Sequence, residues 1–319
     1  MSPPSKRIIL AGGTGFLGDT LNAFLGEREY RVTVLSRSDP MKSARRVVHW
    51  DGRTLDTWAS EIEGAFAVIN LSGRSVDCRY TPRHRQEILD SRVDSTRILG
   101  EAMQGCRQPP EIWLNAGTAT LYRHSFDKPM DESSQDFSPT PGVNDAFSVQ
   151  VAQAWEQAMS SWKLPATRRV ILRLGMVLST RAGSVYAVLR RLASAGLGGS
   201  MGDGRQFVSW IHVRDFCRAV EWLLHRPALD GPVNVVAPEP IPNAQMMSVF
   251  RRACHRSFGL PASRPMLELG ALLLRTETEL ILKSRRVVPR RLLESGFSFD
   301  FPTFEAAIDD LEKSRASHR

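Results

Sequence analysis

Three glycines at intervals of three residues follow directly after an apolar run near the start of the sequence. Gly12, Gly15 and Gly18 come after residues 8–11, which have the composition of a buried strand. A side chain at Gly12 or Gly15 would block a ligand in the turn, and a helix beginning near Phe16 would point its free N–H groups at a phosphate. The pattern predicts a dinucleotide pyrophosphate site formed by Gly12, Thr14, Gly15, Phe16, Leu17 and Gly18.

Glycines at this spacing also occur in turns that bind nothing, so the flanking segments carry the argument. An amphipathic segment at residues 17–25 and a β-branched run at residues 31–35 follow the turn. The motif therefore lies in the strand, helix, strand order that such a site requires.

The end of the second predicted strand indicates which dinucleotide binds. Sites for NAD carry a carboxylate about 20 residues past the glycines, whereas sites for NADP carry an Arg for the 2′-phosphate. Here Ser36 and Arg37 occupy the strand end, and Lys42, Arg45 and Arg46 follow. We predict NADP(H) as the cofactor, bound through Ser36 and Arg37. The alternative is a solvated basic loop.

Strand-like runs alternate with helical patterns along the chain, which predicts an α/β fold, a doubly wound parallel sheet with a smaller C-terminal substrate lobe. Ligands in that architecture lie outside the carboxyl ends of the strands. We predict a nucleotide-binding Rossmann domain at residues 1–178 plus 208–240, and a substrate lobe at 179–207 plus 241–319. The predicted strands are 8–11, 32–35, 47–50, 67–71, 112–116, 170–174 and 233–236, with helices near 17–26, 82–105, 145–163 and 214–226.

Composition narrows the class of protein. The 319 residues are 42% hydrophobic, which is ample for a core, and the formal charge of +8 comes from dispersed basic residues. We expect an anionic ligand rather than nucleic acid. The four cysteines lack metal-ligand spacing, so no metal is predicted. No apolar run is long enough to span a membrane, and the amino end lacks a secretory pattern, so we expect a cytoplasmic protein.

Several segments together resemble the extended short-chain dehydrogenase/reductase superfamily, and more narrowly its atypical "epimerase family protein" branch, which is close to NAD-dependent epimerase/dehydratases. The resemblance covers nearly the whole chain. It rests on Gly12-Gly-Thr-Gly-Phe-Leu-Gly18, Ile69-Asn-Leu-Ser-Gly73, Tyr80-Thr-Pro-Arg-His-Arg-Gln-Glu87, Asp90-Ser-Arg-Val-Asp-Ser-Thr-Arg97, Gly202-Asp-Gly-Arg-Gln-Phe-Val-Ser-Trp-Ile-His212 and Val288-Pro-Arg-Arg-Leu-Leu-Glu-Ser-Gly-Phe297.

The resemblance implies further cofactor contacts at the end of the fourth strand and on the helix after it. Ser72 and Gly73 would let the backbone pass close to a ribose, and Ser91 would face the same cleft. Asn70 has an equally good interpretation as a residue that forms the turn. The implied contacts are Asn70, Leu71, Ser72, Gly73 and Ser91.

The proton-transfer pair of the standard reductases, a Tyr with a Lys four residues later, is absent. No Tyr in this chain precedes a Lys by four positions, and the matching helix carries Ser148 and Ala152 instead. The resemblance places Thr118 or Thr120 as the partner that orients a carbonyl. Tyr122 is a candidate replacement acid.

Arginines near the predicted cleft are candidates for binding an anionic substrate. Arg173 ends a buried strand at the correct edge of the sheet, and the alternative is that it ties a loop to that sheet. Arg205 and Gln206 could likewise bind a phosphate or carboxylate. Asp215 is expected to cap a helix rather than to act in catalysis.

Together these features predict an NADP(H)-dependent oxidoreductase or epimerase-like enzyme acting on a small molecule, without the usual Tyr-x-x-x-Lys pair. The alternative, a redox sensor or structural module that binds the cofactor without turnover, draws its support from that missing pair. The resemblance also implies that the helices near 82–105 and 145–163 could pair in a homodimer.

Overall fold

A computed structural model of the chain describes residues 6–28, 30–37, 46–274 and 277–317. Its centre is a seven-stranded sheet in the order β10-β6-β5-β4-β1-β2-β3, and every pairing in that sheet is parallel. The strand order reverses between β1 and β4, so the crevice at the carboxyl ends of these two strands is where this fold binds ligands. The strands are β1 (Arg7–Ala11), β2 (Arg31–Ser36), β3 (Val47–His49), β4 (Ala67–Asn70), β5 (Ile112–Thr118), β6 (Arg168–Leu174) and β10 (Gly231–Val235).

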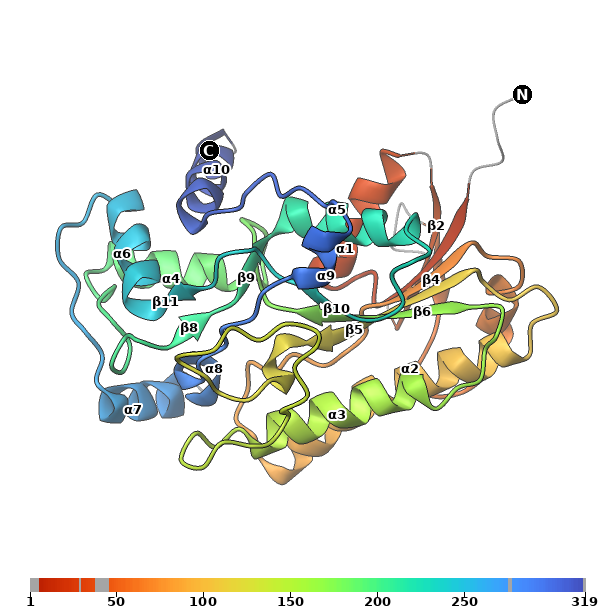
Figure 1. Cartoon of the computed structure of the whole chain (residues 1–319), viewed down its shortest axis with the longest axis horizontal. Helices are drawn as coiled ribbons and strands as arrows, with labels where there is room; N and C mark the ends of the chain where they lie inside the picture. The colour runs from red at the N-terminus through yellow and green to blue at the C-terminus, as the bar shows by residue number, and fades with distance from the viewer. Residues whose placement is uncertain (1–5, 29, 38–45, 275–276, 318–319) are drawn as a thin grey trace.

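Helices cover both faces of the sheet (Figure 1). Helices α1 (Phe16–Gly26) and α5 (Val213–Leu224) lie on one face, and α2 (Pro82–Gln104) and α3 (Ala146–Ser160) on the other. Successive residues of a strand point to opposite faces, so Ile8 packs in the core under α1 and α5 while Ile9 packs in the core under α2 and α3. The predicted doubly wound parallel sheet is confirmed.

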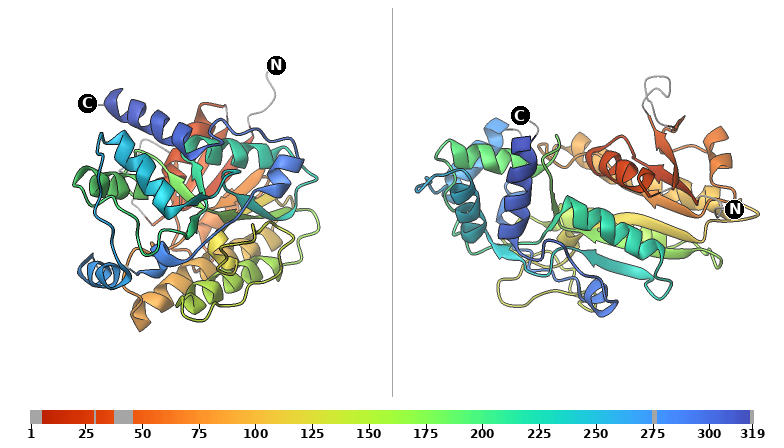
Figure 2. Two further views of the ribbon diagram at one scale, coloured as in Figure 1. Left: turned by 60° about the vertical axis from the view of Figure 1, so that its left-hand side comes forward. Right: turned by 90° about the horizontal axis from the view of Figure 1, so that it is seen from above.

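Most of the remaining elements form a smaller lobe beyond one end of the sheet (Figure 2). Their own apolar cluster is centred on Tyr186, Trp210, Phe250 and Phe304. They are β7 (Met176–Leu178), α4 (Val185–Ser194), β8 (Phe207–Val208), β9 (Trp210–His212), β11 (Ile241–Pro242), α6 (Asn243–Ala253), α7 (Arg264–Leu274), α8 (Glu279–Leu282) and α10 (Phe304–Ser317). The short helix α9 (Arg290–Glu294) packs on the central sheet instead, and the 3-10 helices η2 (Thr57–Glu61) and η3 (Ala119–Leu121) also belong to the sheet domain.

The domain boundaries stay a prediction. Strand β7 pairs in parallel with β9, and both strands lie within the stretches assigned to the Rossmann domain. Within the stretch assigned to the smaller lobe, Leu292 and Phe297 pack in the cluster that covers the central sheet. The chain therefore returns to the sheet after building the lobe.

The start of α5 differs from the prediction that Asp215 caps it. His212 is the N-cap, and its Nδ1 accepts a hydrogen bond of 3.2 Å from the N–H of Arg214. Asp215 lies fully buried in the first turn, where its carboxylate accepts the backbone N–H groups of Asp300 and Phe301. The carboxylate thus anchors the segment that leads into α10.

Within the described part of the chain, no helix combines the length and the apolar character needed to cross a bilayer.

Candidate functional site

The glycine turn after β1 has little room for side chains. Gly12 has a φ of +76°, and a Cβ added there would lie 2.9 Å from the backbone of Leu71 and Ser72. Gly18 is buried in the first turns of α1, and a Cβ there would lie 2.5 Å from the Cα of Gly13. Glycine at both positions therefore lets α1 and the end of β4 close tightly around the turn.

The open side of the same turn is the amino end of α1. Gly15 is the N-cap residue and has no side chain, so it forms no cap hydrogen bond with the first N–H groups of the helix. A Cβ on Gly15 would meet only the Gly12 carbonyl oxygen, at 3.4 Å, and Thr14 and Gly15 are exposed. Uncapped amides at a helix amino end, next to an exposed turn, suit a pyrophosphate. The residues present therefore fit a dinucleotide.

The end of β2 supplies a cation beside this turn. Ser36 is buried, and its Oγ lies 2.9 Å from the Thr14 Oγ1, which ties the turn to β2. Arg37 follows it and is exposed. Arg46 forms an ion pair of 2.8 Å with Glu61. Lys42 and Arg45 lie outside the described residues.

The chain turns at the end of β4, and the side chain of Asn70 there forms hydrogen bonds within the protein. Asn70 is fully buried; its Oδ1 accepts the N–H of Ser72 at 3.0 Å and its amide donates to Asn115 Oδ1 at 2.8 Å. These bonds give Asn70 the turn-forming role. Ser72 Oγ, in contrast, is buried with no hydrogen-bond partner among the described residues, which leaves it for a ligand. Leu71 is half-buried, and Gly73 is exposed beside it.

Two polar residues of the helix after β4, Ser91 and Arg92, differ in whether the protein itself occupies their side chains. Ser91 Oγ accepts the N–H of Arg74 at 2.9 Å and donates to the Ile88 carbonyl at 3.1 Å, so this serine serves the local backbone rather than a cofactor. Arg92 donates to the same carbonyl and lies 5.1 Å from the ring centre of Trp155. Burial lowers the pKa of Arg92 to about 10. No carboxylate of the described residues forms an ion pair with it.

The end of β5 carries the predicted threonines. Thr118 and Thr120 are both half-buried, and Thr118 Oγ1 accepts the N–H of Thr120 at 3.1 Å. Tyr122, in contrast, is 1% exposed; its hydroxyl donates to Asn234 at 2.9 Å and accepts from Arg173 at 2.7 Å. Burial raises the pKa of Tyr122 to about 12. This buried tyrosine joins β5 to β10 and is badly placed to protonate a substrate.

The predicted substrate arginine belongs to the protein interior. Arg173 is 3% exposed and forms two hydrogen bonds, of 2.8 and 2.9 Å, with the carboxylate of Glu156 on α3. We therefore correct the substrate assignment of Arg173, because a guanidinium held by a carboxylate and by Tyr122 has no free face for a ligand.

The other two predicted substrate residues, Arg205 and Gln206, differ in their exposure to solvent. Gln206 is buried, and its amide donates to the carbonyl oxygens of Met201 and Ile281, so its role is structural. Arg205 is exposed, with its guanidinium 5.4 Å from the ring centre of Phe126.

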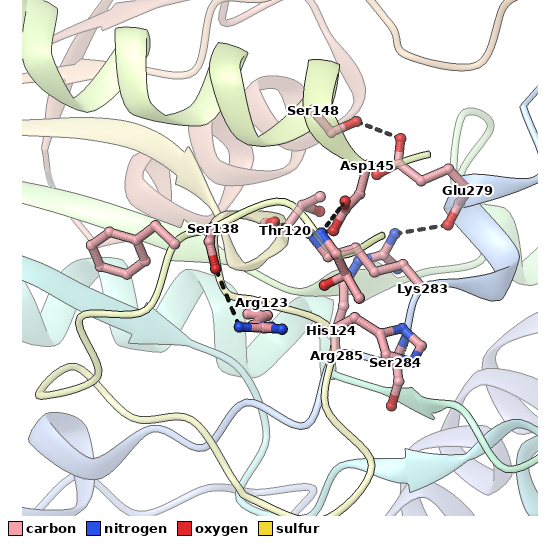
Figure 3. A network of polar contacts seen from close by, with 12 residues as sticks. Thr120, Arg123, His124, Ser138, Asp145, Ser148, Glu279, Lys283, Ser284 and Arg285 are labelled. Carbon is pink, nitrogen blue, oxygen red and sulfur yellow. Dashed lines mark hydrogen bonds and ion pairs between the residues drawn. The ribbon is translucent and has the colours of Figure 1, made fainter. Parts of the chain in front are cut away.

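A network of polar side chains that the sequence motifs do not reveal lies beside Thr120 (Figure 3). Lys283 donates to the Thr120 carbonyl at 2.7 Å and pairs with Asp145 at 2.9 Å. Ser148 on α3 donates to Glu279 at 2.6 Å. Glu279 and Lys283 come from α8 and the residue after it, far along the chain. The only feature of the sequence that could have drawn attention to these two residues is the spacing of a Glu four positions before a Lys.

Comparison with known proteins places these features in context. Residues 8–236 match the NAD dependent epimerase/dehydratase family, and residues 262–311 match DUF1731, a domain of unknown function. The epimerase family protein SDR39U1 of Bos taurus is 32% identical over 312 residues, covering 96% of this chain and 99% of that protein. The epimerase family protein YfhF of Bacillus subtilis is 30% identical over 318 residues, covering 97% and 99%.

A solved structure extends the similarity to the fold. The crystal structure of human epimerase family protein SDR39U1 with NADPH matches with a TM-score of 0.83 at 29% identity, covering 96% of this chain and 99% of that chain.

Proposed function

The chain belongs to the NAD dependent epimerase/dehydratase family, and we propose that within it the protein binds NADP(H) and acts as an oxidoreductase or epimerase-like enzyme on a small anionic or polyol substrate. The resemblance seen in the sequence motifs is thereby confirmed at the level of the family. The observation that carries the proposal is the uncapped amino end of α1 beside the glycine turn.

The preference for the phosphorylated cofactor rests on Arg37. This guanidinium is exposed at the end of β2, one residue past Ser36, which contacts the turn through Thr14. A 2′-phosphate on the adenosine ribose would meet a positive charge there, and the described residues give Arg37 no ion pair that would compete. The structure of the human relative with NADPH supports the same choice.

The chemistry would take place where β4 and β5 end. A bound reduced nicotinamide supplies a hydride there, and the chain must orient the substrate carbonyl and deliver a proton. Thr118 and Thr120 are half-buried at this edge and present hydroxyl groups for the first task. The helix face that would supply the usual proton donor carries Ser148 and Ala152, so the second task needs other groups.

An anionic substrate is favoured by Arg92. A Cβ on Gly73 would lie 3.3 Å from the Arg92 guanidinium carbon, so this cation lies directly beside the exposed turn after β4. A mostly buried guanidinium without a carboxylate partner is stabilised by an anion that enters the cleft. Arg92 thus takes the role that the sequence suggested for Arg173.

Titration of the protein with NADPH and with NADH, followed by cofactor fluorescence, tests the proposal. We expect tighter binding of NADPH, and we expect Arg37→Glu to abolish or reverse that preference. Arg31→Glu is the matched control, because Arg31 is an exposed residue at the opposite end of the same strand. Equal affinities for the two cofactors, or binding of neither, would contradict the assignment of Arg37.

A cofactor-binding sensor without turnover is the second candidate. The presence of Ser148 and Ala152 in place of a Tyr and a Lys favours it, since general acid catalysis typically contributes about 10²- to 10⁴-fold in rate. A panel of carbonyl substrates that includes phosphorylated and carboxylated sugars separates the two candidates. Oxidation of NADPH by any of them eliminates the sensor.

A further inference from the structure

Two residues four positions apart bring an acid and a cation to the edge of the sheet where the helical Tyr and Lys are missing. Glu279 begins α8, and the N–H of Lys283 donates to its carbonyl at 3.1 Å, so the two side chains lie one helical turn apart. In space they lie beside Ser148 and Thr120, although they are 131 and 163 residues away from them in sequence. Figure 3 shows the side chains converging from α3, the end of β5 and α8.

Glu279 has the surroundings of a neutral carboxylic acid. Its side chain is 5% exposed, and its Oε1 is buried with no hydrogen-bond partner among the described residues. Burial raises the pKa of Glu279, and the hydrogen bond from Ser148 opposes that rise. An ionised carboxylate with one buried, unpaired oxygen would be costly, whereas a protonated one leaves little charge to solvate.

The charged groups around Glu279 are of both signs. Arg285 and Lys283 favour its ionised form, whereas Asp145 opposes it. Tyr80 approaches from the segment before α2, and its own pKa is raised to about 12, chiefly by burial. The carboxylate can therefore form when a proton leaves, because two cations are near, but burial favours the return of that proton.

Lys283 connects the amino end of α3 to the segment that follows β5. It is 1% exposed, the one buried lysine among the described residues, and its ammonium bridges Asp145 and the Thr120 carbonyl. A buried ion pair of this kind fixes geometry more than it adds stability. It fixes the distance between α3, which carries Ser148, and the threonines at the end of β5.

We propose that Ser148, backed by Glu279, is the proton donor of this protein, and that Lys283 is the positioning residue that sets it beside Thr120. The proposal rests on the proposed function and names its missing acid. Ser148 is half-buried, whereas Glu279 is only 5% exposed, so in this scheme the proton of Glu279 passes to a substrate through the Ser148 hydroxyl.

The proton balance of a carbonyl reduction is complete in this scheme. The carbonyl carbon takes the hydride supplied by the reduced nicotinamide, and the carbonyl π bond breaks toward oxygen. For the transfer, the Ser148 hydroxyl turns from the Glu279 carboxyl to the carbonyl oxygen, and the protonated carboxyl donates a hydrogen bond to the Ser148 oxygen in its place. The carbonyl oxygen then takes the Ser148 proton as the serine oxygen takes the proton of the Glu279 carboxyl. Glu279 is left as a carboxylate near Lys283 and Arg285, and it is reprotonated from water after the alcohol leaves.

Infrared difference spectroscopy of the carboxylic acid C=O band tests the proposal without a substrate. Subtracting the spectrum of Glu279→Gln from that of the wild type at pH 7 should reveal a protonated carboxyl group. Subtracting that of Glu294→Gln, an exposed glutamate on α9, should reveal none. Ser148→Ala should shift the band, because the substitution removes the hydrogen bond between the Ser148 hydroxyl and the carboxyl group.

The response of this carboxyl band to the oxidation state of the bound cofactor separates a proton donor from a carboxyl group with only a structural role. Oxidised nicotinamide is cationic, so NADP⁺ should lower the pH at which the band disappears by about one unit relative to NADPH. Absence of the band at neutral pH, or the same titration with both cofactor forms, would overturn the proposal. If neither cofactor binds, both the proposed function and this proposal fail. If both bind and the band does not respond, only this proposal fails.

Discussion

Replacing Arg173 by methionine should destabilise the protein while leaving cofactor binding intact. The Arg173 side chain is 4% exposed and that of Glu156 is 16% exposed, and the two are joined by paired hydrogen bonds. Methionine keeps most of the apolar stem but removes the charge, so the Glu156 carboxylate loses its partner. Removing one member of a buried ion pair typically costs about 3 to 5 kcal/mol. Because Glu156 keeps some access to water, we expect a loss at the low end, about 3 kcal/mol.

Urea unfolding followed by tryptophan fluorescence measures this loss, with NADPH titration as the parallel measurement. Glu156→Gln provides the reverse single change, and the double variant completes a thermodynamic cycle. Because neither charge remains in the double variant, its loss of stability should be smaller than the sum of the two single losses by about 2 kcal/mol. Unchanged stability of Arg173→Met, together with loss of substrate binding, would refute this reasoning and restore the substrate role for Arg173.

Three further changes test the turn, the strand end and the helix cap. Gly18→Ala should weaken NADPH binding and cost about 1 to 3 kcal/mol, because the added methyl group collides with the backbone of Gly12; unchanged affinity in the fluorescence titration would contradict the close packing. Asn70→Ala should lower the urea midpoint by removing buried hydrogen bonds worth about 1 to 3 kcal/mol, without changing cofactor preference. Burial lowers the pKa of His212 from its ordinary 6.5 to about 4, and its Nδ1 must stay unprotonated to cap Arg214. As the pH falls, His212 is therefore protonated in the unfolded chain before it is protonated in the folded protein. The free energy of unfolding is thus highest above about pH 6.5 and decreases toward pH 4. His212→Gln should show a shallower decline of the urea midpoint over that range, and parallel declines would count against this explanation.

Local patterns in the sequence account for most of the sheet and its helices. The β-branched and apolar runs predict all seven strands of the central sheet, and helices α1, α2, α3 and α5 begin and end close to the expected residues. These elements are set by periodicity and by glycine, proline and capping residues at their ends, which are local properties. The glycine turn belongs to the same class, because Gly12, Gly15 and Gly18 lie within one strand, turn and helix.

The partners of buried charges were not available from local patterns. Arg173 was predicted to face the cleft from its place at a strand end, but the side chain turns to Glu156, and only the packing of α3 against β6 brings that carboxylate within reach. Tyr122 was likewise a candidate acid because it lies just past the end of a strand, yet its side chain is buried and its hydroxyl donates to Asn234 on β10. Hydrogen bonding of a buried polar group depends on which elements pack together, which a single sequence does not state.

The sequence by itself determined the family, the parallel sheet and the glycine turn, because each depends on motifs of residues that are neighbours along the chain. Only the tertiary structure decided which side chains surround the carboxyl ends of β4 and β5. Glu279 and Lys283 match an ordinary helical pair in the sequence, but the packing of α8 against α3 and the end of β5 buries both side chains beside Ser148 and Thr120. Their environment is a consequence of packing, and packing joins residues that the sequence keeps far apart.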